Sequence, residues 1–384
     1  MSGNGTEGQA WQIGFVMEQT LGHRAHAQTL GWGVERDPDV EAHWLPVEFD
    51  SEGLPWSLPL VRHNWSLRGS LRAARSLGEL AGRHLDALFI HTFTISLMAG
   101  RYLDRIPTVL STDATPENYD RVGSWYNHRV MPGSIENLKR RVRRRVIRKA
   151  AAIVTWCDWA KQSLVADYGV DPFRIHVIPP GADLPKFAFG SRARINGHDK
   201  PMQLLFVGGD FHRKGGQVLL QAYRAGLRNR AELHLVTEED VPPENGVFVY
   251  RGLTSNSPEL LSLYRKADVF VLPTLGDCFP VVMGEAMAAG LPIVTTDVGA
   301  LPEAVQHGEN GFVVPAGDDV ALVSALDVLL RNPHLRIEMG VEGRRIAEDR
   351  FDSGRNAQRV LDVLKSVCAR SQTMPQSIPP VRSR

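Results

Sequence analysis

The chain is poor in cysteine: its 384 residues include only Cys157, Cys278 and Cys368. An odd number of widely spaced cysteines excludes a disulfide framework and a four-ligand zinc site, and it favours a reducing cytoplasm. No window approaches the roughly 18 uncharged apolar residues of a membrane span. The first residues contain no basic segment followed by an apolar one, so a secretory signal is not expected.

Net charge is also scarce, at +1, while 43% of the residues are apolar. This balance excludes disorder as the bulk state. The small net charge conceals one basic segment, residues 139–149 (KRRVRRRVIRK), which has eight basic and no acidic residues. Leu138, Val142 and Val146 recur at every fourth position, which predicts a helix with one buried face.

Two interpretations of this basic segment, Lys139–Lys149, stay open. It fits a solvated helix near a cleft, and it fits attraction to an anionic membrane surface. A nucleic-acid partner is not expected, because no recognisable nucleic-acid module accompanies the charge.

Short apolar runs alternate with longer amphipathic stretches in both halves of the chain. Uninterrupted runs such as LLFV, VFVL and AAIV are typical of parallel strands buried on both faces. The expected strands are 13–17, 43–47, 87–91, 108–111, 152–155, 175–179, 204–207, 233–236, 248–250, 269–272, 293–295 and 312–314, and helical patterns cover 216–227, 258–267, 280–289 and 320–330. This alternation predicts an α/β fold with two doubly wound, Rossmann-like domains.

A segment rich in proline, glycine and charge, near 184–201, separates the two halves. We therefore expect an N-terminal domain over 1–190 and a C-terminal domain over 191–350. One long helical pattern, 335–369, predicts a terminal helix (351–369) that returns to the first domain, followed by a disordered tail at 370–384. Ligands of such sheets bind at the carboxyl ends of the strands, so the cleft between two facing domains is the expected site.

Some patterns do not carry function. Gly3, Gly5 and Gly8 match the dinucleotide fingerprint but precede the first strand instead of following it. The pair Asp37 and Asp39 has the spacing of a metal-binding motif but also lies before a strand. His23 and His26 lack a further ligand nearby, so helix capping or substrate contact is favoured over metal binding.

The densest signal is the segment 273–290, PTLGDCFPVVMGEAMAAG, which follows a buried strand. Pro280 suits the first position of a helix, whose free N–H groups near Phe279 and Val281 are suited to phosphate. Asp277 and Glu285 are eight positions apart and suit hydroxyl groups, as on a sugar ring and a ribose. Alternatively, Asp277 caps the helix and Glu285 is a solvated helical residue.

The segment 206–216, FVGGDFHRKGG, also follows a buried strand and opens a helix. Gly208 and Gly209 allow a ligand to approach the backbone closely, and Arg213 and Lys214 place two cations suited to a diphosphate. A solvated basic turn is the alternative. The turn at Gly299 is expected at the same cleft, unless it is an ordinary connection between strand and helix.

Candidates in the first half follow its strands. Gly22 comes after the first strand and leaves room for a substrate, and His91 ends the strand DALFIH on the cleft side. His91 is either functional or a satisfied strand-end residue. Asp113 and Tyr119 follow the next strand, where they line an acceptor site or pack within a loop.

Taken together, these motifs resemble the GT-B glycosyltransferases of family 4. The signature of that family, two acids separated by seven residues, corresponds to Asp277 and Glu285 followed by AMAAGLPIV. The segments RKG (213–215), VIPPGAD (177–183) and TDVGALPEAVQHGENGFVVPAGD also fit. The similarity covers nearly all of the second half and is looser in the first, where GHRAHAQTL and FIHT carry it.

The resemblance implies retaining transfer of a sugar from a nucleoside diphosphate sugar, most simply of UDP or GDP, without a bound metal or other cofactor. The acceptor is a glycan, a lipid-linked sugar or a small molecule, held by the N-terminal domain. Carried over by position, the resemblance implies that Arg213 and Lys214 neutralise the diphosphate, that Glu285 accepts the ribose hydroxyls and that Asp277 holds the donor sugar. Further donor contacts are implied for Gly209 and for the backbone of Phe279, Pro280 and Val281, while Gly252 and Leu253 border the base. In the first half, His91 lies by the reacting carbon, and the acceptor side is formed by Gly22, His23, Asp113 and Tyr119.

One position departs from the family pattern, because Asp277 stands where glutamate is usual. Its shorter side chain is compensated by the loop, changes the choice of donor, or abolishes activity. The rest of the constellation is intact, so we predict an active cytoplasmic enzyme, soluble or peripheral on the inner face of a membrane. A non-catalytic GT-B protein that binds a nucleotide or glycan, and a nucleotide-sugar epimerase, are the alternatives.

Overall fold

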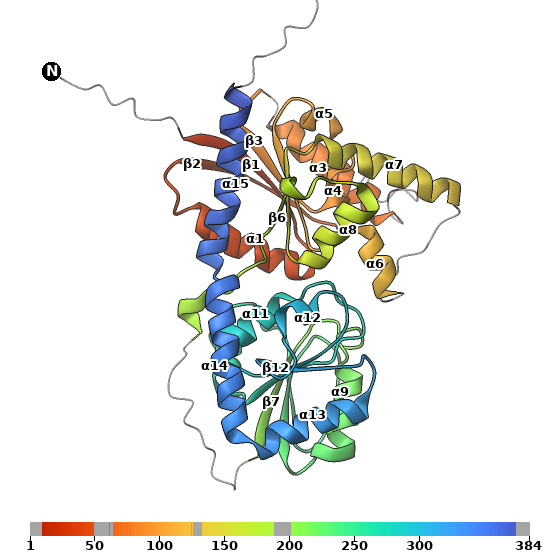
Figure 1. Ribbon diagram of the computed structural model, residues 1–384, viewed down its shortest axis with the longest axis vertical. Helices are drawn as coiled ribbons and strands as arrows, with labels where there is room; N and C mark the ends of the chain where they lie inside the picture. Colours follow the sequence, from red (N-terminus) through yellow and green to blue (C-terminus); the bar gives the residue numbers. More distant parts are fainter. Residues whose placement is uncertain are drawn as a thin grey trace, which may run out of the picture.

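The computed structural model describes residues 10–49, 61, 64–80, 82–123, 125, 133–187 and 201–373. These residues form two parallel sheets flanked by helices, stacked along the long axis of the molecule (Figure 1). The predicted α/β class with two Rossmann-like halves is therefore confirmed.

In the described residues the first sheet has the strand order β2-β1-β3-β4-β5-β6, and all neighbouring strands are parallel. Its strands are β1 (Trp11–Glu18), β2 (Val40–Val47), β3 (Ala87–His91), β4 (Thr108–Thr112), β5 (Ala152–Thr155) and β6 (Ile175–Val177). The strands β3, β4 and β5 are buried along their whole length, as their uninterrupted apolar character predicts.

The helices around this sheet are α1 (Leu21–Val34), α3 (Trp65–Glu79), α4 (Phe93–Ser96), α5 (Gly100–Leu103), α6 (Pro116–Val122), α7 (Gly133–Lys149) and α8 (Asp158–Tyr168). Short 3₁₀ turns, Pro172–Arg174 and Leu184–Lys186, flank β6. The helix α6 begins with a capping box, in which the Thr115 hydroxyl accepts from the Asn118 amide and the Asn118 side chain accepts from the Thr115 amide.

The second sheet has the order β12-β11-β10-β7-β8-β9 in the described residues, again with parallel neighbours. Its strands are β7 (Met202–Val207), β8 (Ala231–Val236), β9 (Val247–Tyr250), β10 (Val269–Leu272), β11 (Ile293–Thr296) and β12 (Gly311–Val314). The accompanying helices are α9 (Gly216–Ala222) with a π turn at Tyr223–Leu227, α10 (Pro258–Lys266), α11 (Val281–Ala288), α12 (Leu301–Ala304), α13 (Asp319–Arg331), α14 (Pro333–Arg350) and α15 (Ser353–Thr373).

The chain ends in α14 and α15, and α15 runs beside the first sheet (Figure 1). The helical pattern over 335–369 is divided in two, because α14 ends at Arg350 and α15 begins at Ser353. Between them the chain pairs with Ala182, which follows β6: the Ala182 amide donates to the Phe351 carbonyl (2.8 Å), and the Ser353 amide donates to the Ala182 carbonyl (3.0 Å). The α15 helix extends to Thr373, and the rest of the predicted tail lies outside the described residues.

The basic segment forms the C-terminal part of α7, but the predicted buried face is only partly present. Val146 is 4% exposed, whereas Val142 is 40% and Leu138 61% exposed. The end of α7 is anchored through Lys149, which pairs with Asp104 and donates to the Gly100 carbonyl. Arg140 pairs with Glu117 (3.2 Å), and Arg144 donates to the Asp167 carbonyl (2.8 Å). The N-terminal part of α7 extends away from the first sheet (Figure 1), which leaves Leu138 and Val142 exposed.

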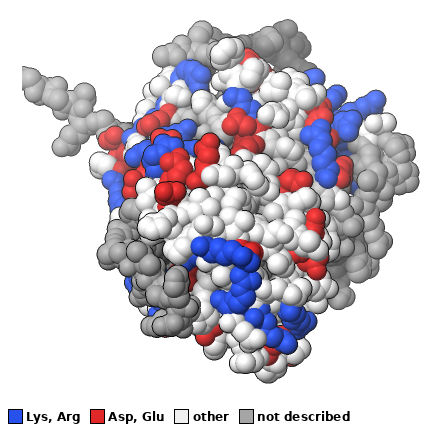
Figure 2. All heavy atoms as spheres, turned by 60° about the horizontal axis from the view of Figure 1, so that its bottom comes forward, with Lys and Arg blue, Asp and Glu red and all other residues white. Residues whose placement is uncertain are grey.

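Basic and acidic side chains are intermixed on the face of the molecule drawn in Figure 2. The segment 139–149 differs, because all of its charged residues are basic. None of the helices in the described part of the chain is long and apolar enough to cross a membrane.

Candidate active site between the two sheets

The loop between β10 and α11 holds Asp277 in a buried position, with 5% of the residue exposed. Its Oδ1 accepts from the Cys278 amide (3.0 Å), and its Oδ2 pairs with the Lys214 ammonium and lies 3.6 Å from Arg213 Nη1. The alternative in which Asp277 caps the helix is wrong, since α11 has Pro280 at its N-cap and no side-chain cap. Asp277 instead neutralises two cations.

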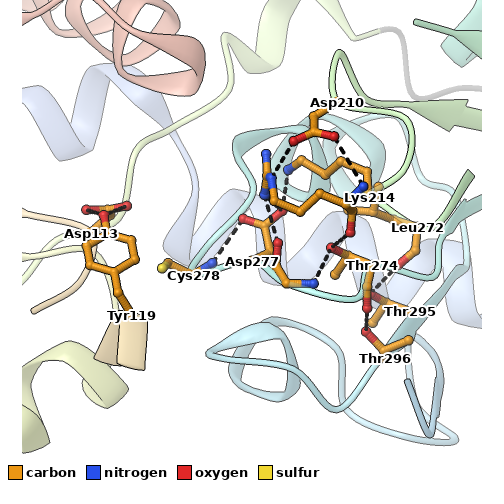
Figure 3. A network of polar contacts seen from close by, with 12 residues as sticks. Asp113, Tyr119, Asp210, Lys214, Leu272, Thr274, Asp277, Cys278, Thr295 and Thr296 are labelled. Carbon is orange, nitrogen blue, oxygen red and sulfur yellow. Dashed lines mark hydrogen bonds and ion pairs between the residues drawn. The ribbon is translucent and has the colours of Figure 1, made fainter. Parts of the chain in front are cut away.

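Both of these cations come from the loop between β7 and α9. Arg213 is 6% exposed; its Nε donates to Asp210 (2.9 Å) and its Nη1 to the Gly276 carbonyl (2.8 Å). Figure 3 shows Asp277 between Lys214 and Cys278, with Asp210 on the far side of the cations. The alternative of a solvated basic turn is wrong, because the side chains of Arg213 and Lys214 are only 8% and 14% exposed.

Two glycines let these loops close on one another. Gly215 has φ +79° and Gly299 has φ +59°, in the left-handed region that favours glycine. A Cβ at Gly215 would overlap the Pro273 carbonyl, and one at Gly299 would overlap the Asp277 carbonyl. The turn at Gly299 is therefore part of the same cluster as Asp277.

Glu285 lies inside α11, and the residue is 6% exposed. Tyr264 Oη donates to its Oε2 (2.8 Å) and Ser255 Oγ to its Oε1 (3.0 Å). Burial raises the pKa of this carboxyl above its ordinary value, although the two hydroxyl bonds oppose that shift. The alternative of a solvated helical glutamate is therefore wrong. The sequence reasoning missed Tyr264 and Ser255, whose hydroxyls orient the carboxylate.

The remaining donor-side candidates divide into open backbone and buried side chains. Around Gly209 and Gly252 a Cβ would meet nothing within 4 Å, so both positions leave the backbone accessible. Phe279 is 6% exposed and its ring stacks on Phe351 (5.9 Å), while Leu253 packs against the core of the second sheet. The side chains of Phe279 and Leu253 are thus structural, and any ligand contact there is left to the backbone.

In the first domain, His91 ends β3 and is completely buried. Its Nδ1 lies 3.0 Å from Ser111 Oγ and its Nε2 lies 2.9 Å from His23 Nδ1, while Trp156 stacks on its ring at 5.2 Å. Burial, together with the charges of His23 and His26, holds the pKa of His91 well below its ordinary value. His91 is thus a neutral imidazole with both nitrogens engaged.

Two carboxylates lie beside these imidazoles. Tyr119 Oη lies 3.2 Å from both oxygens of Asp113, and burial raises the pKa of Asp113. Glu18, at the end of β1, accepts from the hydroxyls of Thr20 and Thr92, each at 2.6 Å. The sequence reasoning missed Glu18, although an acid that closes the buried strand WQIGFVME signals a functional edge.

Several contacts bring the halves of the site together. A Cβ at Gly22 would lie 3.6 Å from a methyl group of Val281, and one at Gly276 would lie 2.6 Å from Trp125 Cβ. The Glu303 carboxylate of the second domain accepts from the Asp158 and Trp159 amides of the first, at 2.8 and 2.6 Å. The start of α1 therefore faces the start of α11.

Two family descriptions match the chain and together span most of it. Residues 4–186 match Glycosyltransferase Family 4, and residues 201–332 match Glycosyl transferases group 1. The chain belongs to glycosyltransferase family 4.

Several curated relatives of the chain are named D-inositol 3-phosphate glycosyltransferase. The one from Pseudarthrobacter chlorophenolicus is 33% identical over 215 residues, or 51% of either chain. The one from Corynebacterium kroppenstedtii is 30% identical over 243 residues, which cover 57% of this chain and 54% of that relative. The chain thus spans about half the length of the curated relatives it matches.

Several solved structures resemble this fold over nearly the whole chain. Sucrose-phosphate synthase from Thermosynechococcus elongatus has a TM-score of 0.77 at 18% identity, covering 94% of this chain and 100% of that one. HepE from Anabaena in complex with UDP-glucose has a TM-score of 0.68 at 18% identity, covering 92% and 99%. At such identities the likeness establishes the GT-B fold, with its two Rossmann-like domains.

Proposed function

We propose that the protein is a retaining, metal-independent glycosyltransferase that moves a sugar from a nucleoside diphosphate sugar to a hydroxyl acceptor. The observation that carries this proposal is the buried cluster of Lys214, Arg213 and Asp277 at the start of α11, with Glu285 eight residues further on. Two preorganised cations suit a diphosphate leaving group, whose charge grows as the glycosidic bond breaks.

Each carbohydrate-binding group then has a defined task. The diphosphate replaces Asp277 as the anion paired with Lys214 and Arg213. Asp277, which still accepts from the Cys278 amide, then accepts hydrogen bonds from hydroxyls of the donor sugar. Glu285, oriented by Tyr264 and Ser255, accepts the ribose hydroxyls. The contacts of Gly22 and Glu303 with the facing domain support a closed arrangement that excludes water from the donor.

For the donor we propose a uridine nucleotide, because HepE, a neighbour in fold, is described in complex with UDP and with UDP-glucose. For the acceptor, D-inositol 3-phosphate is the first compound to test, because the curated relatives carry it in their name. Its hydroxyls would approach from the side of Asp113 and Tyr119.

The proposal is tested by thermal unfolding with UDP, GDP and ADP and by transfer assays with the corresponding sugar nucleotides. A ligand that binds only the folded state adds about 2.7 kcal/mol of stability at a hundred times its Kd. We expect a selective shift with UDP and a glycosylated product with retained configuration, at full rate in a chelator. A shift without turnover would favour a non-catalytic nucleotide-binding protein, and an epimer formed without acceptor would favour an epimerase.

We further propose that α7 docks this cytoplasmic enzyme on an anionic membrane surface. Leu138 and Val142 are exposed beside Arg141 and Arg145, which suits shallow insertion among acidic headgroups. Flotation with vesicles that contain or lack phosphatidylserine tests this. Recovery should require the acidic lipid and be lost in Arg141→Glu/Arg145→Glu, while the control Arg251→Glu/Arg265→Glu, in the other domain, still floats. Equal recovery with both vesicle types would contradict membrane docking.

A further inference from the structure

Three polar side chains form a continuous chain at the carboxyl edge of the first sheet. Ser111 is the next-to-last residue of β4 and pairs with His91, which ends β3, while His23 lies in the first turn of α1. The Ser111 Oγ is 3.0 Å from His91 Nδ1, and His91 Nε2 is 2.9 Å from His23 Nδ1. The chain leads from the interior of the domain toward the cleft.

The two imidazoles differ in what they can reach. His91 is completely buried, its nitrogens are both engaged, and the rings of Trp156 and His26 pack on it at 5.2 and 4.9 Å. His23 is partly exposed, and its Nε2 has no hydrogen-bond partner within the described residues. The next residue back, Gly22, faces Val281 of the donor-side helix α11. A substrate atom between the domains therefore meets His23 before it meets His91.

We propose that His23 is the imidazole that contacts the substrate hydroxyl at the point of transfer, and that His91 is a positioning residue that fixes the ring of His23. This inference rests on the proposed function and replaces the expectation that His91 itself lies against the reacting carbon. This assignment predicts that the rate of sugar transfer depends on Nε2 of His23.

The hydrogen-bonded chain has two proton arrangements. In one, Ser111 donates to His91, His91 Nε2–H donates to His23 Nδ1, and His23 Nε2–H donates to the substrate. In the other, His23 Nδ1–H donates to His91 Nε2, His91 Nδ1–H donates to Ser111, and His23 Nε2 accepts from a substrate hydroxyl. The two arrangements carry the same number of protons and differ only in which nitrogen of each imidazole is protonated, so neither places a charge on the chain.

The two imidazoles packed beside His23 are neutral. Burial, chiefly, keeps His91 and His26 neutral, and it lowers the pKa of His26 to about 3. The facing carboxylates of Asp113 and Glu18 accept from hydroxyls and form no ion pair among the described residues. The described residues hold no group of three His, Cys, Asp or Glu suited to a metal.

The test compares His23→Ala, His91→Asn and Ser111→Ala with the control His84→Ala, whose side chain is 80% exposed. Transfer rate, the pH profile of kcat and the unfolding shift with UDP are measured for each full-length protein. We expect His23→Ala to lose about 100-fold or more in kcat, to keep the UDP shift and to regain activity with added imidazole. Ser111→Ala should shift the pH profile of kcat, while the stability of the folded protein stays near that of the wild type.

The His91→Asn variant should lose activity that imidazole does not restore. Retention of more than half of the wild-type kcat in His23→Ala would overturn the inference, as would rescue of His91→Asn but not of His23→Ala by imidazole. Failure of the proposed function is distinguishable, because the wild-type protein would then give neither a UDP shift nor a product.

Discussion

Replacing Asp277 by asparagine should lower the stability of the free protein and raise its affinity for UDP. Asp277 neutralises Lys214, whose side chain is 14% exposed, and lies near Arg213. Removing one partner of a buried ion pair costs about 3–5 kcal/mol, because the other charge stays behind uncompensated. Since Arg213 keeps its partner Asp210, we expect a loss at the lower end, about 3 kcal/mol.

The diphosphate of UDP supplies the anion that Asp277→Asn lacks. The ligand no longer displaces a carboxylate from Lys214, so the Kd of UDP should fall at least tenfold, about 1.4 kcal/mol. Transfer should slow by tenfold or more, because asparagine receives sugar hydroxyls less strongly than a carboxylate does. Calorimetric titration with UDP and thermal unfolding with and without UDP measure both effects.

Two further variants make this test decisive. Asp210→Asn removes the other carboxylate that contacts Arg213, but its side chain is 46% exposed, so both effects should be small. In Asp277→Asn/Lys214→Met the stability of the free protein should recover while UDP binding is lost. Weaker UDP binding by Asp277→Asn than by the wild type would refute the reasoning, because the carboxylate would then assist the diphosphate instead of competing with it.

Three other variants probe the site and its frame. Glu285→Gln should stabilise the free protein at pH 7. Burial raises the pKa of the Glu285 carboxyl, so the folded protein loses stability as pH rises above the pKa of this carboxyl in the unfolded chain. The affinity for UDP should drop at least tenfold, and retained affinity would contradict the assignment of Glu285 to the ribose. Glu303→Ala should cost about 1–2 kcal/mol of stability, because α8 loses its cap from the facing domain; Glu309→Ala, on the surface, is the control. Burial alone would raise the pKa of Asp37, but hydrogen bonds from Lys365 and the Asp39 amide outweigh it and hold the pKa below 3.8, so this pair stabilises above that pH and less below it. Lys365→Met should therefore unfold more easily at pH 7 and lose less between pH 5 and 3 than the wild type does; parallel acid curves would contradict this.

The strands were predictable because each is a local, uninterrupted apolar run. The segments 87–91, 152–155 and 269–272 coincide with β3, β5 and β10 to the residue. The break between α14 and α15 could not be predicted from the sequence. The helical periodicity continues through Phe351, and the residue that pairs with the chain at the break, Ala182, lies far away in sequence. Local patterns thus specify elements, while long-range pairing decides where they stop.

The same distinction applies to the site. Glycines and charges after buried strands pointed to the loops at Lys214, Asp277 and His91. That Lys214 pairs with Asp277, 63 residues away, and that His23 contacts His91, 68 residues away, depends on how strand ends meet in space. A strand-end residue can be named from its segment, but whether it is free or engaged cannot.

The helix α15 has a consequence for the order of events during synthesis. Leu361 and Leu364 on α15 complete the apolar cluster over Phe15 and Phe89 of the first sheet. The ribosome must add residues 188–373 after that sheet is finished, which takes about 10–40 s at 5–20 residues per second. For that time the nascent first domain exposes an uncovered hydrophobic face, which makes it a natural client for chaperones that bind the emerging chain.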